Sequence, residues 1–213
     1  MVSVTGADNI KSVLKNEFKG PDDGINTKLM GEGFKEVFGD EGLLYESDAE
    51  KHAMLRRIVG QAMTPAALGA ALPMISDAAS IQIDKVLEGN DIEMERVFHE
   101  YTLDIAWKQI LGLDLTEEEV PEFIRYVDDW LGNIMNPLLL MPFRIPGLIS
   151  FSKVGRAHTY LVSKVEDKLA KLDRDGPDDS TMSKLYFATD DDGTTKLTRR
   201  QVIDNAMLLI VED

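Results

Sequence analysis

Apolar residues recur at three- and four-residue spacing through most of this chain, which is the period of an amphipathic helix. The stripes are Leu55, Ile58, Val59 and Ala62; Ile75, Ala79, Ile83 and Val86; Phe98, Tyr101 and Ile105; Phe123, Val127, Trp130, Leu131 and Ile134; Leu161, Val165, Leu169 and Leu172; and Ile203, Met207 and Ile210. Val2 to Thr5 alternates instead and is stopped by Gly6, which predicts a short N-terminal strand. The predicted fold is mainly α, with no internal repeat.

Several helix starts are marked by residues that can bind free backbone amides. Three pairs have the spacing of a capping box: Ser47 with Glu50, Thr116 with Glu119, and Thr198 with Gln201. Thr64-Pro65 predicts an N-cap followed by a first helical position. Asn136 to Gly147 holds three prolines among apolar residues, which predicts an irregular connection, either buried or facing an apolar partner. Asp173 to Asp179 predicts an exposed turn.

Composition narrows the function classes. The chain has 213 residues, with 23 Lys and Arg against 38 Asp and Glu, so its net charge is −15. This balance argues against a nucleic-acid partner, which requires clustered cations. There is no cysteine, so the chain supplies neither a disulfide nor a thiolate metal ligand. No secretory signal pattern is visible, and the longest apolar run, Pro137 to Phe143, is too short to cross a bilayer. We therefore expect a soluble or peripheral chain.

Three familiar motifs are incomplete or absent. Asp190 to Gly193 resembles the middle of a calcium-binding EF-hand loop, but that register places Ala188 first and Arg199 twelfth, where carboxylates are needed. The segment is better interpreted as a tight turn. Neither a zinc-protease H-E-x-x-H motif nor a G-x-S-x-G nucleophile motif occurs, so hydrolase chemistry has no support.

One pair of side chains does suggest a site. His52 and Arg56 stand four residues apart, so both project from the same side of the predicted helix, beside the apolar stripe of Leu55 and Ile58. An imidazole and a planar guanidinium at the edge of an apolar face can bind a carboxylate on an apolar body. Spacing alone favours instead an ordinary amphipathic helix with a partly buried histidine and a solvent-directed arginine, because i,i+4 pairs of this kind are common.

The surrounding sequence favours the site. His52-x-x-x-Arg56-Arg57-x-x-x-x-Ala62-Met63-Thr64-Pro65 resembles the C-helix signature of the cytochrome P-450 family, H-x-x-x-R-R-x-x-x-x-A-F-T-P. The likeness continues in order: Val2 to Leu14 is similar to the family's strand and B helix, Gly42 to Leu44 to a short apolar stretch before the C helix, Glu93 to Gly112 to the E helix, and Leu197 to Leu209 to the approach to the central I helix. Residues 1–213 thus resemble a partial cytochrome P-450 domain, truncated within the I helix.

The resemblance implies a function. His52 and Arg56 would donate hydrogen bonds to the haem propionates, Ile25 to Tyr45 would be the variable loop over the substrate, and Asn136 to Gly147 would be the F to G loop that lines substrate access. The family inserts one oxygen atom from dioxygen into an organic substrate, here expected to be lipophilic, with electrons from a redox partner. The resemblance also allows the F to G loop to contact a membrane, without requiring it.

Two features depart from the family pattern. The haem iron requires a cysteine thiolate that this chain does not contain, so the ligand must lie outside it, and we expect the 213-residue chain alone to be inactive. Glu212 and Asp213 stand where the family usually has Ala-Gly in the I helix. The alternative function is a non-catalytic, all-helical ligand-binding or protein-interaction module that uses the Pro137 to Phe143 patch as its contact.

Overall fold

The computed structural model describes residues 4–16, 32–46, 48–89, 92–134, 136–140 and 147–211. Within these ranges the regular structure is helical, and no strand is present. Val4 and Thr5, the described half of the predicted N-terminal strand, lie in irregular backbone before helix α1 (Ala7–Asn16). A strand needs a neighbour to pair its N–H and C=O groups, and none of the described segments offers one.

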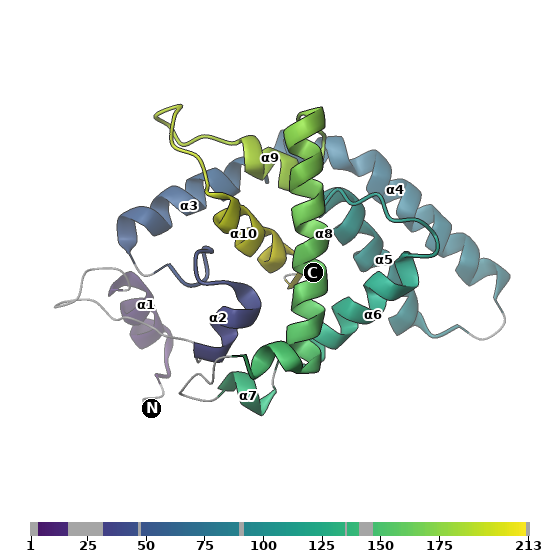
Figure 1. Ribbon diagram of the computed structural model, residues 1–213, viewed down its shortest axis with the longest axis horizontal. Helices are drawn as coiled ribbons and strands as arrows, with labels where there is room; N and C mark the ends of the chain where they lie inside the picture. Colours follow the sequence, from purple (N-terminus) through teal and green to yellow (C-terminus); the bar gives the residue numbers. More distant parts are fainter. Residues whose placement is uncertain are drawn as a thin grey trace.

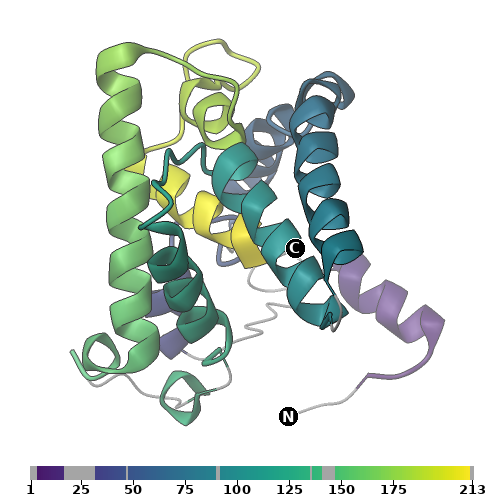
Figure 2. The same ribbon diagram turned by 90° about the vertical axis from the view of Figure 1, so that its right-hand side faces the viewer.

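The other elements follow in chain order: α2 (Glu32–Phe38), α3 (Ala49–Gln61), α4 (Pro65–Glu88), α5 (Met94–Ile105), a π-helical turn η1 (Ala106–Ile110), α6 (Val120–Leu131), α7 (Pro137–Leu140), a 3-10 turn η2 (Ile149–Phe151), α8 (Lys153–Asp175), α9 (Thr181–Phe187) and α10 (Arg199–Val211). Figure 1 shows α8 crossing the middle of the molecule, with α2 and α3 on one side and α4, α5 and α6 on the other. Figure 2 shows α10 passing between α8 and α5.

The core is built around α8 because its apolar stripe is continuous over most of its length. Leu161 and Val165 of this helix are buried, and α6 packs along it with the buried Val127 and Trp130. The ring of Phe38 in α2 lies against Trp130, with 5.3 Å between centroids. The predicted apolar stripes of α6 and α8 are therefore confirmed as core-facing, and they join α2 to the centre of the fold.

The predicted helix starts are mostly confirmed. Thr198 and Gln201 form a complete capping box before α10, with amide-to-oxygen distances of 2.9 and 3.1 Å. Thr64 caps α4 through its hydroxyl. Glu119 accepts a hydrogen bond from the Thr116 amide at 3.0 Å, but this pair closes a turn just before α6 rather than its first turn.

The apolar stripe predicted for α4 is not its buried face. The buried residues of α4 are Ala71, Ala78 and Gln82, whereas Ile83 is 57% exposed. Five exposed side chains form what we call the α4–α5 apolar face: Leu68, Leu72, Ile83, Leu87 and Phe98. Helix α4 is also long and apolar enough to cross a membrane by length and composition, a test that single helices of soluble proteins also pass. Periodicity identified an apolar stripe, but it does not determine what covers it.

The proline-rich connection and the acidic turn also differ from expectation. Pro137 begins the single helical turn α7, because a proline at the first position of a helix loses no hydrogen bond. Leu139 in this turn is fully buried, and residues 141–146 lie outside the described ranges. The predicted turn after Asp173 begins only once α8 has ended at Asp175, and its Asp178 pairs with the buried Lys168.

Candidate functional site

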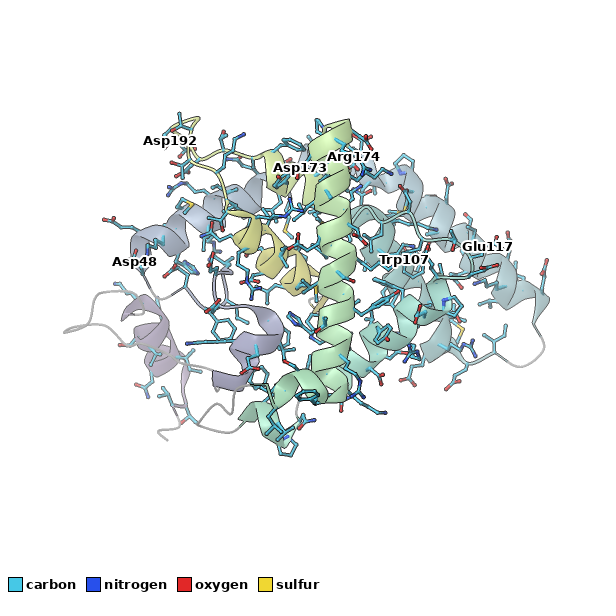
Figure 3. All side chains as sticks on the ribbon, in the orientation of Figure 1. Asp48, Trp107, Glu117, Asp173, Arg174 and Asp192 are labelled. Carbon is cyan, nitrogen blue, oxygen red and sulfur yellow. The ribbon has the colours of Figure 1, made fainter. Side chains whose placement is uncertain are left out.

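Helix α3 carries the predicted site, and its start is set by Asp48. The Asp48 side chain accepts hydrogen bonds from the amides of Glu50 and Lys51, at 3.0 and 2.9 Å. The predicted cap was Ser47, which lies outside the described residues, so the helix begins one residue later than the capping-box spacing indicated. Figure 3 shows Asp48 at this end of α3.

His52 and Arg56 occupy one side of α3. Leu55 and Ile58, which flank them in the sequence, are fully buried and anchor the helix in the core. His52 is partly buried and Arg56 is exposed, so a polar edge borders an apolar face, as the spacing predicts. Whether these two side chains bind an acid group is not tested by the structure and stays a prediction.

The adjacent Arg57 has a different partner. Its guanidinium makes a two-pronged bond to the Asp190 carboxylate, at 2.9 and 2.8 Å. Gln61, one turn further along α3, donates to the carbonyl of Thr189 at 2.9 Å. The loop between α9 and α10, whose tip carries Asp192 in Figure 3, is thereby fixed to the C-terminal half of α3. The acidic turn that resembled part of a calcium loop therefore has a structural partner.

A polar cluster on α10 was not predicted from the sequence. The side chain of Asp204 is 3% exposed. It forms an ion pair with Arg200 at 3.0 Å and accepts a hydrogen bond from the backbone amide of Glu41, also at 3.0 Å. The Asn205 side-chain oxygen accepts a hydrogen bond from the backbone amide of Leu43, at 3.0 Å. The signal was present in the sequence as two adjacent polar residues that interrupt the otherwise apolar run from Val202 to Val211.

Burial shapes the protonation of this cluster. Desolvation raises the pKa of Asp204, while the Glu41 amide and the Arg200 charge act in the opposite direction. His158 of α8 lies close enough to feel the same arginine. Desolvation, with a smaller contribution from Arg200, lowers the pKa of His158 to about 4, so its ring is neutral at neutral pH.

The donor set on α3 is of the chemical type that the predicted propionate role requires. His52 and Arg56 offer N–H donors beside an apolar face, which suits a propionate carboxylate on an apolar macrocycle. The iron ligand is a different matter, because the chain has no cysteine, and no group of three or more His, Asp or Glu side chains in the described ranges could hold a metal ion. A pocket of about 300 Å³ lies elsewhere, between α4 and α5, and does not include either residue.

Comparisons of the whole fold define the class. A scan against protein-family models finds no match, and a search of curated proteins finds none either. Solved structures do match: the retinoic acid-bound cyanobacterial cytochrome P450 CYP120A1, with 19% identity and a TM-score of 0.69, over 84% of this chain and 40% of that one. The cytochrome P450 CYP109Q5 of Chondromyces apiculatus matches with 20% identity and a TM-score of 0.61, over 80% and 38%.

The chain therefore has a mainly α, cytochrome P450-like fold, and it corresponds to the portion that the sequence resemblance indicated. It spans about 40% of the length of the two structures it matches. The predicted C-helix and E-helix segments are α3 and α5, and α10 is the predicted approach to the I helix. Glu212 and Asp213, which depart from the family pattern, lie outside the described residues.

Proposed function

We propose that this chain is the N-terminal part of a haem-dependent monooxygenase that inserts one oxygen atom from dioxygen into a lipophilic substrate. The observation that carries the proposal is a cytochrome P450-like fold in which His52 and Arg56 share one side of α3. The haem, held by a cysteine outside this chain, supplies the oxygen chemistry, with electrons from a redox partner.

The chain's own residues bind and orient the cofactor in this proposal. Arg56 donates to one propionate as a permanent cation, and His52 donates through a ring N–H. The buried Leu55 and Ile58 hold α3 in place, so the two donors are presented from a fixed helix rather than from a loop. Positioning donors on a regular element lowers the cost of ordering them when the ligand binds.

Arg56→Ala in the complete enzyme tests the site. Loss of a charge-assisted hydrogen bond to a propionate weakens haem binding by about 1.5 to 3 kcal/mol, or roughly 10- to 150-fold. Haem content per polypeptide and the rate of haem transfer to apomyoglobin measure the effect. Arg174→Ala, an exposed arginine on α8, is the matched control and should leave both unchanged. Unaltered haem retention in Arg56→Ala would remove Arg56 from the site.

The 213-residue chain by itself should not form the cofactor complex. Without a cysteine it lacks the thiolate, so we expect weak or no haem binding and no turnover. A titration of the purified chain with haemin, followed in the Soret band, is the measurement. A stoichiometric complex with a thiolate-type spectrum would contradict the proposal.

The source transcript provides an independent test. If the reading frame continues past the codon for Asp213 into an E-x-x-R segment and a cysteine-containing F-x-x-G-x-x-x-C loop, the proposal gains its missing iron ligand. A stop codon directly after Asp213 would instead favour the non-catalytic helical module as the function of this chain. Sequencing the transcript in both directions distinguishes the two.

A further inference from the structure

The backbone that leads into α3 lies directly on α10. Figure 1 shows this segment between α2 and α10. The amides of Glu41 and Leu43 donate to Asp204 Oδ2 and Asn205 Oδ1, both at 3.0 Å, although the partners are 163 and 162 residues apart in sequence. Both acceptors belong to one turn of one helix. The two bonds therefore hold three consecutive residues of the segment in a single register against α10.

Glycine is required where the segment meets Asp204. Gly39 has φ +80°, and a Cβ built there would lie 1.9 Å from the carboxyl carbon of Asp204. Gly42 is less constrained, since a Cβ there would lie 3.3 Å from Asp204 Cβ, a close contact rather than an overlap. An L side chain is disfavoured at Gly39 both by its backbone conformation and by the carboxylate. The sequence has thus kept space for the Asp204 side chain.

Asp204 and Asn205 bind backbone amides of the segment rather than its side chains. The Nδ2 of Asn205 donates to the Gln201 carbonyl at 2.7 Å, and this bond orients its Oδ1 toward Leu43. A buried carboxylate costs free energy unless it is paired, and Asp204 has Arg200 and the Glu41 amide as partners. We expect a buried carboxylate that carries this free-energy cost to fix the position of the segment that it binds.

A second attachment lies at the other end of α3. Arg57 binds Asp190 and Gln61 binds Thr189, so the loop that enters α10 is joined to the C-terminal half of α3. His52 lies in the chain between Leu43 and Arg57, the two points of attachment. Helix α3 is consequently tied to α10 or its approach on both sides of the predicted site.

We infer that Asp204 and Asn205 are positioning residues that hold the segment of Gly39 to Leu43 on α10 and thereby set the place of His52 and Arg56 on α3. They act through the backbone amides of that segment. The inference rests on the proposed function, because it is the haem-propionate role of the α3 pair that gives this positioning its purpose.

The test uses the 213-residue chain and two readouts that need no haem. Asp204→Asn and Asn205→Ala are compared with Asp178→Asn, which replaces the exposed carboxylate partner of the buried Lys168 in another part of the fold. Hydrogen exchange followed by mass spectrometry reports the amides of residues 41–43. Carbethoxylation of the three histidines by diethyl pyrocarbonate, quantified on peptides, reports the surroundings of His52.

In Asn205→Ala the Leu43 amide should exchange about fivefold faster, because it loses its only described acceptor. The modification rate of His52 should change by about twofold or more in the same variant. In this variant, which leaves Asp204 and its partner Arg200 unchanged, His158 on the central helix α8 should keep its rate, and this separates a local release from general unfolding. Asp204→Asn should act in the same direction, and Asp178→Asn should alter neither readout.

Two results would overturn the inference. Unchanged exchange at residues 41–43 in both variants would show that the segment is not held by α10. Faster exchange with an unaltered His52 rate would show that the hold is local and does not position α3. The haem experiment is separate: if Arg56→Ala retains haem normally while these variants disturb His52, the proposed haem role of Arg56 fails and the attachment of α3 to α10 stands.

Discussion

His158 makes the stability of this protein depend on pH within a defined window. Its pKa is about 4 in the folded chain, against 6.5 for an ordinary histidine, mainly because its ring on α8 is desolvated and secondly because Arg200 is near. The unfolded chain therefore takes up a proton at this side chain below pH 6.5, whereas the folded chain does not until pH 4. Stability from His158 is complete above pH 6.5 and is lost as the pH falls toward 4.

The magnitude follows from the two pKa values. A separation of 2.5 units, from 6.5 to about 4, is worth about 3 kcal/mol, of which about 2 kcal/mol is lost by pH 5. This exceeds what an exposed ion pair contributes, and it is a large part of the stability of a typical domain. The carboxylates with lowered pKa values, such as Asp178, begin to titrate in the unfolded chain only near pH 4.

The assay is urea unfolding at a series of pH values between 7 and 4.5 for the wild type and His158→Gln. The glutamine stays neutral. Between pH 7 and pH 5 the free energy of unfolding of the wild type should therefore fall by about 2 kcal/mol more than that of His158→Gln. Ser163→Ala, an exposed change on the same helix, should follow the wild type at every pH. Parallel curves for the wild type and His158→Gln would refute the reasoning, as would a folded-state ring titration near pH 6.5.

The remaining predictions concern the segment before α3, the core and the α4–α5 apolar face. Gly39→Ala should lower the free energy of unfolding by about 2 kcal/mol or more, measured by urea titration, because of its positive φ and its contact with Asp204. Trp130→Ala should cost about 3 to 5 kcal/mol in the same assay, since the side chain is fully buried. The double variant Leu72→Gln and Ile83→Gln should reduce binding of an apolar-surface dye without lowering the melting temperature; unchanged dye binding would place the exposed apolar surface elsewhere.

Local features of the fold were predictable because their causes lie within a few residues. The caps at Thr64 and Thr198 follow from spacings of three or fewer residues, and the buried stripe of α8 follows from its own period. The exposure of Ile83 was not predictable, because burial depends on which elements pack against a helix, and α4 presents its alanines and Gln82 to its neighbours instead. Periodicity identifies a stripe, whereas packing decides its partner.

The residues of the candidate site were likewise predictable only in part. His52 and Arg56 were found from i,i+4 spacing together with a family resemblance, and their haem role stays a prediction. Asp204 and Asn205 were not found, because acidic and amide side chains are usually exposed to solvent, and the partners of these two lie more than 160 residues away. The sequence features that relate to this contact are two polar residues, Asp204 and Asn205, within an otherwise apolar run, and Gly39 far upstream.

The attachment of Leu43 to Asn205 also has a consequence for synthesis of the chain. Because 162 residues separate the two partners, the ribosome must add that many residues before the bond can form. At 5 to 20 residues per second, the nascent segment before α3 waits roughly 10 to 30 s for its acceptor. During that interval its glycines and free amides are open to chaperones and proteases, so limited proteolysis of stalled nascent chains should cut there until α10 has emerged.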